Sequence, residues 1–371
     1  MTSSSPSVPA DAAIRARIEQ WVRPEIRALN AYHVPPAAGL IKLDAMENPY
    51  RWPPTVVEAW LETLREVALN RYPDPGADAL KRELRTFFGV PRGMDLLLGN
   101  GSDELLQIVA LAVAAPGRVA LAPQPAFSMY RMISIFTGLD FVGVPLRATD
   151  FALERETVLA EIARRRPALV LLDYPNNPTG GLFEAETMRA VIEAAPGLVV
   201  VDEAYQAFSE TTLMDWLHDH PNLLVLRTLS KMGLAGLRLG MLAGRPEWIT
   251  ELDKIRLPYN INVLTQASAA FALRHRTMLE EQAGRLRADR EGLVAALRAC
   301  RGLTVYPSRA NFILFRAPAG RGGEIFAGLR ERGVLIKNLD GASDALRDCL
   351  RVTVGTPEEN QAFLTALTAV L

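Results

Sequence analysis

The chain has 371 residues, of which 49% are hydrophobic and 22% are charged, and its formal net charge is −1. These values are typical of a soluble globular protein of two domains, and they exclude a disordered, collagen-like or disulfide-stapled chain. The balanced charge predicts no binding of nucleic acid or of an anionic membrane. With two cysteines and no apolar secretory segment near the N-terminus, we expect a cytoplasmic protein without a membrane span.

The predicted elements begin with a helical pattern over residues 13–29, followed by an extended arm over residues 30–50 that prolines interrupt. Between about residues 97 and 245, apolar runs of strand length alternate with helical patterns, which is typical of a mostly parallel sheet with helices on both faces. The predicted strands are 119–121, 141–144, 168–173, 198–202, 223–226 and 239–243, and the helices between them include 103–114, 159–166 and 184–195.

The C-terminal part has a different character, because short strands alternate with helices after a helix-rich stretch over residues 263–299. The strands are predicted at 311–315, 334–337 and 350–354. Thr356, Pro357 and Glu359 have the pattern of a capping box that opens a final helix. We therefore expect an arm with part of a small domain over residues 1–45, a large domain over residues 46–262 and a small α+β domain over residues 263–371.

Polar motifs follow several predicted strands, at the edge of a parallel sheet where ligands bind. They are GNGSDE (99–104), NNPTG (176–180), DEAY (202–205) and Ser230-Lys231 with Arg238 beyond it. Each motif alone has a structural explanation as a turn, a helix cap or a solvated pair. Their common position at strand ends favours one shared site instead.

Together the motifs meet the requirements of pyridoxal 5′-phosphate (PLP). A helix N-terminus at Gly101 and Ser102 offers N–H groups to a phosphate, to which Ser230 and Arg238 add a hydroxyl and a bidentate cation. Lysine is the residue that forms a Schiff base with a carbonyl cofactor. Of the five lysines in the chain, only Lys231 follows a predicted strand beside a serine.

The ring of the same cofactor needs two further kinds of partner. An aspartate such as Asp202 keeps a pyridine nitrogen protonated, which makes the ring a stronger electron sink. Asn177 and Tyr205 are suited to hydrogen-bond the phenolic oxygen of the ring. All three residues lie in the motifs that follow predicted strands.

In order and spacing, these motifs resemble the fold-type I PLP-dependent aminotransferases. The stretches LNAYHV, KLDAMENPY, NRYPDP, RTLSKMGLAGLRLG and CLRVTVGT are similar to histidinol-phosphate aminotransferases, and the resemblance runs from about Val22 to the C-terminus. It implies a large domain with a mostly parallel seven-stranded sheet between helices, a smaller α+β domain, and a homodimer with shared active sites.

The resemblance also implies roles for individual residues. Lys231, Asp202 and Tyr205 would be catalytic. The cofactor would contact Gly101, Ser102, Asp103, Phe127, Asn177, Asp202, Tyr205, Ser230, Lys231, Arg238 and, from the partner subunit, Tyr72. The substrate would contact Tyr32, Asn48, Lys337 and Arg351. The four histidines lack the spacing of metal ligands, so no metal site is expected.

Two departures from the family pattern affect the binding of phosphate. The spacing from Lys231 to Arg238 is seven residues, where eight is common in related enzymes. Lys337 stands where some relatives have an arginine, and it keeps the charge without the bidentate fork.

The expected function is amino-group transfer between L-histidinol phosphate and 2-oxoglutarate in histidine biosynthesis, with imidazole-acetol phosphate and glutamate as products. One alternative is an aminotransferase for aromatic or other amino acids, and another is a PLP-dependent decarboxylase of a phosphorylated amino acid. A non-catalytic PLP-binding domain of a transcription regulator is disfavoured, because no DNA-binding helix pair is predicted before residue 40.

Overall fold

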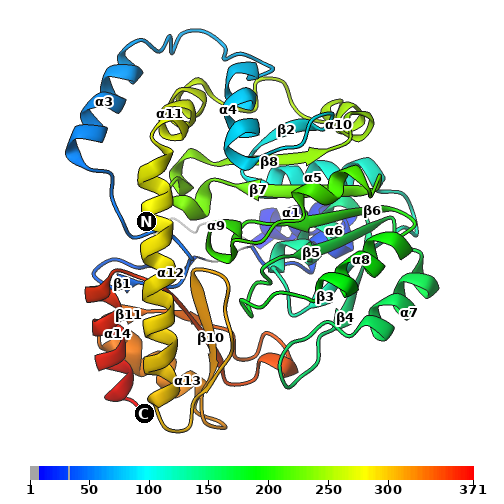
Figure 1. Ribbon diagram of the computed structural model, residues 1–371. Coiled ribbons are helices and arrows are strands. Elements are labelled where there is room, and N and C mark those ends of the chain that lie inside the picture. The colour runs from blue at the N-terminus through cyan, green and yellow to red at the C-terminus, as the bar shows by residue number, and fades with distance from the viewer. Residues whose placement is uncertain (1–7, 32–33) are drawn as a thin grey trace, which may run out of the picture.

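The computed structural model describes residues 8–31 and 34–371, and a seven-stranded sheet forms its centre (Figure 1). Its strands are β2 (Asp95–Asn100), β3 (Val119–Gln124), β4 (Asp140–Pro145), β5 (Leu169–Asp173), β6 (Leu198–Asp202), β7 (Leu223–Thr228) and β8 (Leu239–Gly244). Their spatial order is β2-β8-β7-β6-β5-β3-β4. Strand β8 is antiparallel to both neighbours and the other paired strands are parallel, so the predicted mostly parallel sheet is confirmed.

Helices cover both faces of this sheet and create two apolar cores. One core lies under α5 (Ser102–Val113), α6 (Ser128–Thr137) and α10 (Pro246–Asp253). The opposite core lies under α4 (Asp78–Phe88), α7 (Arg155–Arg165), α8 (Ala185–Ala194), α11 (Val263–Arg274) and the 3₁₀ helix η1 (Met214–His218). Successive residues of a strand point to opposite faces, so Leu97 packs in the first core while Leu96 and Leu98 pack in the second.

A second, antiparallel sheet lies in the C-terminal part, with the order β12-β13-β10-β9. It consists of β9 (Thr304–Val305), β10 (Phe312–Arg316), β12 (Lys337–Asn338) and β13 (Cys349–Thr353). The helices α12 (Arg276–Ala299), α13 (Gly322–Glu331) and α14 (Pro357–Thr368) supply apolar side chains to its core. The capping box predicted at Thr356 and Glu359 is confirmed at the start of α14.

The predicted strand over residues 334–337 is two strands that belong to different sheets. Strand β11 (Val334–Leu335) pairs in parallel with β1 (Ile41–Lys42), whereas β12 pairs with β13. The chain passes from one sheet to the other at the buried Ile336. The pairing of β1 with β11 joins the N-terminal arm to the C-terminal part, while the domain boundaries at residues 45 and 262 stay predictions.

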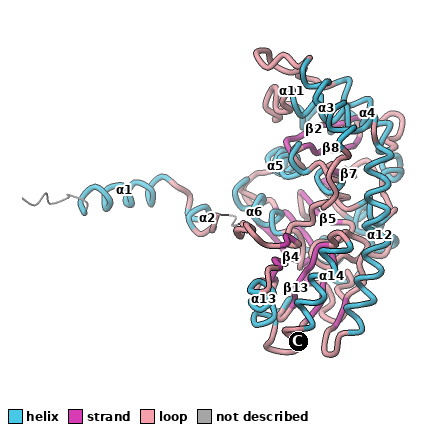
Figure 2. The backbone as a smooth tube through the Cα atoms, turned by 90° about the vertical axis from the view of Figure 1, so that its left-hand side faces the viewer, coloured by secondary structure: helices cyan, strands magenta, loops and turns pink. Residues whose placement is uncertain are grey.

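The predicted helix over residues 13–29 is also divided, into α1 (Val8–Trp21) and α2 (Pro24–Arg27). Arg23 adopts an extended conformation with φ −50° and ψ 138°, because the ring of a following proline disfavours helical geometry. Helix α1 extends away from the sheets, as Figure 2 shows. The remaining helices are α3 (Pro54–Arg65), α9 (Gln206–Ser209), η2 (Ser230–Met232), η3 (Ala235–Leu237) and η4 (Asp344–Leu346). Across the described ranges, no helix has the length and apolarity to cross a bilayer.

Candidate active site

A cavity of about 100 Å³ lies where the parallel strands β5, β6 and β7 end. Residues that the sequence analysis selected form most of its wall: Ser102, Asp103, Phe127, Asn177, Asp202, Tyr205, Ser230, Lys231 and Arg238. They come from the ends of separate strands and from the loops that follow, which the parallel pairing brings to one edge of the sheet. The structure therefore assembles the predicted cofactor-binding motifs around one space.

Asp202 ends β6 and is almost fully buried, with 5% of its surface exposed. Its carboxylate accepts hydrogen bonds from Tyr130 Oη at 3.0 Å and from the Ala204 backbone N–H at 3.0 Å. Burial raises the pKa of Asp202 to about 6, because a buried carboxylate loses its hydration. A cation placed in the cavity against this carboxylate would be strongly stabilised.

Tyr130 is a residue of this site that the sequence analysis missed. Its side chain is fully buried, and burial together with the neighbouring Asp202 raises the pKa of its phenol well above the usual value. The phenol therefore stays protonated and donates to Asp202. The available signal was helical spacing, since Tyr130 follows Phe127 by three residues in PAFSMY and its ring packs edge-on against that of Phe127, with centroids 5.7 Å apart.

Lys231 lies in the short helix η2 after β7. Its Nζ donates a hydrogen bond to the Ala45 carbonyl at 3.4 Å and lies 5.7 Å from the centre of the Tyr205 ring. Burial, with a smaller contribution from the nearby Arg351 guanidinium, lowers the pKa of Lys231 to about 8. A neutral amine is the nucleophilic form of lysine, so this environment favours covalent chemistry at Nζ.

The N-terminus of α5 and the side chain of Arg238 form an anion-binding corner of the cavity. Gly101 precedes α5 with φ +88°, and a Cβ at this position would lie 2.5 Å from Arg238 Nη2. Arg238 Nη1 lies 3.5 Å from Ser230 Oγ. The backbone of Arg238 has a left-handed conformation, with φ +50°. With the spacing of seven residues from Lys231, the Arg238 guanidinium lies beside Ser230 and Gly101, while its contact with a cofactor phosphate stays a prediction.

A chain of hydrogen bonds leads from the Tyr205 phenol to Arg351. Asn177 Nδ2 donates to Tyr205 Oη at 3.2 Å, and Arg351 donates to Asn177 Oδ1. Arg351 Nη2 also donates to the Asp44 carbonyl at 3.1 Å. All three side chains are at least 94% buried, so the network has a fixed geometry.

A second cavity of about 490 Å³ adjoins the first, since Met46, Phe127 and Asn177 line both. Arg351 and Lys337 form part of its wall on the side of the antiparallel sheet, where their strands β13 and β12 place them opposite each other in register. The structure therefore brings together two of the residues predicted to contact substrate.

A second buried carboxyl group that the sequence analysis missed, Asp173, organises the loops around both cavities. It accepts hydrogen bonds from the backbone N–H groups of Phe127 at 3.2 Å and Asn177 at 2.8 Å, and from Asn176 Nδ2 at 2.7 Å. Burial raises its pKa to about 7. Asp173 thereby holds the ring of Phe127 and the amide of Asn177 in place.

Asn48 and Tyr72, which were predicted to contact substrate and cofactor, do not line these cavities. Asn48 lines a different cavity and donates to Gln282 Oε1 at 2.9 Å and to the Met232 carbonyl at 3.4 Å. Tyr72 is 80% exposed and stacks on Tyr259, with ring centroids 4.5 Å apart. Tyr32 lies outside the described residues. Within residues 8–31 and 34–371, no group of three or more acidic, histidine or cysteine side chains is arranged to hold a metal ion.

Comparison with known proteins agrees with this geometry. The family model "Aminotransferase class I and II" matches residues 38–367. The chain belongs to the class I and II aminotransferases. Histidinol-phosphate aminotransferase 2 of Nitrosococcus oceani is 59% identical over 95% of this chain and 98% of its own length. Histidinol-phosphate aminotransferase 1 of Ralstonia nicotianae is 53% identical over 100% and 99% of the two chains.

Solved structures show the same fold. Histidinol-phosphate aminotransferase from Sinorhizobium meliloti, solved in complex with PLP, superposes with a TM-score of 0.82 and 25% identity over 94% of this chain and 97% of that chain. L-threonine-O-3-phosphate decarboxylase from Porphyromonas gingivalis has a TM-score of 0.73 at 21% identity over 88% and 98% of the two chains. At that identity the likeness shows the fold alone. The resemblance inferred from the motifs and the fold-type I architecture are confirmed, and the chain is an aminotransferase.

Proposed function

We propose that this aminotransferase binds PLP in the cavity at the strand ends and transfers an amino group between L-histidinol phosphate and 2-oxoglutarate. The observation that carries the proposal is the juxtaposition of two cavities. The smaller is lined by Lys231, Asp202 and an anion-binding corner, and the larger contains Arg351 and Lys337. The names of the relatives from Nitrosococcus oceani and Ralstonia nicotianae support the choice of substrate.

The residues of the smaller cavity match the chemical groups of PLP. The N-terminus of α5 with Ser230 and Arg238 suits the phosphate, and the absence of a Cβ at Gly101 leaves room for the Arg238 guanidinium. The buried carboxylate of Asp202 suits a protonated pyridine nitrogen. Phe127 presents a ring to the cavity, and the Tyr205–Asn177 pair suits the phenolic oxygen.

When bound, PLP supplies an electron sink for the pair of electrons left on the substrate carbon after its proton is removed. Lys231 would hold the cofactor through Nζ, and its free amine would move the proton at the substrate carbon. Asp202 holds the positive charge on the ring nitrogen, and Tyr130 fixes the orientation of that carboxylate through its 3.0 Å hydrogen bond.

The larger cavity binds the anionic end of each substrate. Arg351 offers a guanidinium that is fixed by Asn177 and by the Asp44 carbonyl, and it serves the phosphate of one substrate and a carboxylate of the other in turn. Lys337 adds a second positive charge beside it. We retain Tyr32 as a further phosphate donor and Asn48 as a substrate contact in the proposal.

The active unit in this proposal is a cytoplasmic homodimer with shared sites. Tyr72 is 80% exposed and lies away from the cofactor cavity of its own chain. Leu69, three residues before Tyr72, is 71% exposed. Leu257, two residues before the stacking partner Tyr259, is also 71% exposed. A second copy would cover this apolar surface and receive the Tyr72 hydroxyl at its cofactor phosphate.

The test is the formation of glutamate from 2-oxoglutarate with histidinol phosphate and, separately, with a panel of aromatic and other amino acids as amino donors. We expect the kcat/KM for histidinol phosphate to exceed the kcat/KM for every amino acid of the panel. A higher value for an aromatic amino acid would replace the proposal with the amino-acid aminotransferase alternative. Release of CO₂ from a phosphorylated amino acid without glutamate formation would favour the decarboxylase instead.

A further inference from the structure

The larger cavity carries an unbalanced positive charge. Three cationic side chains line it, Arg131, Lys337 and Arg351, and among the described residues no aspartate or glutamate does so. Burial and the neighbouring Arg351 guanidinium lower the pKa of Lys337, while Asp44 behind it acts in the opposite direction. Asp44 is itself paired with Lys42 at 3.2 Å. Three cationic side chains on the wall of one cavity, with no carboxylate among the described residues that line it, are typical of a site that receives an anion.

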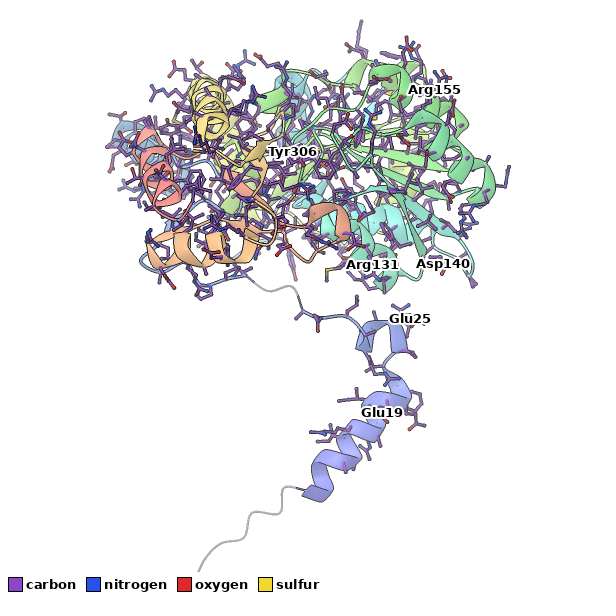
Figure 3. The ribbon with its side chains drawn as sticks, turned by 90° about the horizontal axis from the view of Figure 1, so that it is seen from below. Glu19, Glu25, Arg131, Asp140, Arg155 and Tyr306 are labelled. Carbon is purple, nitrogen blue, oxygen red and sulfur yellow. The ribbon has the colours of Figure 1, made fainter. Side chains whose placement is uncertain are left out.

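Arg131 lines this cavity from a different element than Lys337 and Arg351. It belongs to α6, whereas the other two cations belong to β12 and β13. Ser128, Arg131 and Met132 lie on one face of α6 at helical spacing, and all three line the cavity. Figure 3 labels Arg131 at the lower edge of the globular part. Within the part of the chain that the structure describes, its guanidinium makes no hydrogen bond or ion pair, so no internal carboxylate neutralises it.

The N-terminus of the same helix adds to the positive potential. Phe127 precedes α6 without capping it through a side chain, and the first turn contains no acidic residue. The Tyr130 N–H donates to the Phe127 carbonyl at 3.1 Å, which leaves the N–H groups of Ser128 and Met129 and the Ser128 hydroxyl as the donors of the first turn. The cavity thus has donors on two walls that belong to different layers of the fold.

We propose that Arg131 is a specificity-determining residue that binds the phosphate of the amine substrate together with Arg351 and Lys337. This inference rests on the proposed function and extends it to α6. A phosphate monoester carries close to two negative charges and presents three terminal oxygens, which exceeds what one guanidinium neutralises. A carboxylate has two oxygens and one charge, and Arg351 with its neighbours satisfies it without Arg131.

Arg131 therefore contributes to substrate binding in one half-reaction and not in the other. Histidinol phosphate presents both negative charges on one group, which engages all three cations. Glutamate divides its two negative charges between separate carboxylates, of which Arg351 binds one without help from α6. Loss of the Arg131 charge therefore weakens the phosphorylated substrate selectively. Because Arg131 is exposed to solvent, its contribution lies at the lower end for a charge-assisted hydrogen bond.

The experiment compares Arg131→Gln and Arg131→Lys with wild type and with a matched control, Arg155→Gln. Arg155 is an exposed arginine at the start of α7 that lines neither cavity. We expect Arg131→Gln to raise KM for histidinol phosphate roughly tenfold with kcat nearly unchanged. The KM for glutamate stays within about twofold, Arg131→Lys gives an intermediate value, and Arg155→Gln behaves as wild type.

Inorganic phosphate provides an independent measurement on the PLP-loaded enzyme. We expect its inhibition constant against histidinol phosphate to rise in Arg131→Gln by a factor similar to that of KM. An unchanged KM for histidinol phosphate, or equal rises for histidinol phosphate and glutamate, would overturn the inference while leaving the proposed function intact. Failure of the wild-type enzyme to accept histidinol phosphate would overturn both the inference and the proposed function. The wild-type activity is therefore measured first.

Discussion

Two buried carboxyl groups, Asp173 and Asp202, end neighbouring strands in register, and their surroundings give them different tasks. Asp173 faces three N–H donors from surrounding loops, which occupy its oxygens with structural bonds. Both carboxyl groups line the cofactor cavity, but Asp202 receives only one phenol and one backbone N–H. Asp202 is therefore the carboxylate that can accept a cationic ligand, although the pKa values of both are raised by burial.

Replacing Asp202 with asparagine tests this assignment. Asp202→Asn keeps the shape but removes the negative charge that stabilises a protonated ring nitrogen. We expect kcat to fall by at least about a hundredfold while PLP remains bound, because electrostatic stabilisation of the developing negative charge is lost. Steady-state kinetics with an absorbance titration of PLP checks this outcome. Near-normal turnover in the PLP-saturated variant would remove Asp202 from the mechanism.

Tyr130 acts on the reaction through Asp202, so its removal is expected to have a smaller effect. Tyr130→Phe keeps the buried ring and deletes the 3.0 Å hydrogen bond to Asp202 Oδ2. The pKa of Asp202 in the PLP-free protein then rises further, because that hydrogen bond lowers it in the wild type. We expect this rise, measured by nuclear magnetic resonance titration of the carboxyl carbon, together with a fall in kcat of roughly tenfold. An unchanged pKa would show that the phenol serves only packing.

At the level of elements, the sequence predicted those whose signal is local. Strand β6 matches the predicted 198–202 because the run LVVVD is apolar on both faces and is followed by polar residues. The start of α14 was predicted from Thr356, Pro357 and Glu359, and the side chains of Thr356 and Glu359 each accept a hydrogen bond from the other's backbone N–H. Both cases depend on residues within one segment, so no knowledge of the fold was needed.

The elements that sequence reasoning missed depend on distant partners. Strand β2 (DLLLGN) was not named, and it is recognisable as a strand only through its pairing with β8. The predicted strand 334–337 is divided into β11 and β12 because its two ends pair with strands of different sheets, β1 and β13. Tyr130 and Arg131 were passed over for the same reason. The partner of Tyr130 lies on β6, and Arg131 lines a cavity that separate elements form.

The capping box of α14 gives a stability prediction at this scale. Thr356→Ala removes the hydrogen bond that Thr356 Oγ1 accepts from the Glu359 N–H at 3.2 Å. We expect the free energy of unfolding to fall by about 1 kcal/mol, measured by urea denaturation. The control is Thr368→Ala in the last turn of the same helix, which is exposed and should change the free energy by less than about 0.5 kcal/mol. Equal losses in both variants would contradict the role of the cap.

For the whole molecule, the proposal of shared sites leads to a complementation experiment. Lys231→Ala and Tyr72→Ala each inactivate the homodimer in this account, the first by removing the reactive amine and the second by removing a phosphate contact from the partner's site. Mixing them under conditions of subunit exchange should restore about a quarter of wild-type activity, because half of the dimers are hybrids with one intact site each. A mixture that stays inactive despite demonstrated exchange would contradict shared sites.

The central claim is that Lys231 carries the cofactor at the ends of the parallel strands, and peptide mapping after borohydride reduction tests it most directly. We predict that the purified protein contains bound PLP whose visible absorbance disappears on reduction. The label is then fixed to the peptide that contains Lys231. A label on Lys42, Lys81, Lys254 or Lys337, or a protein that retains no label although PLP is bound, would contradict the account.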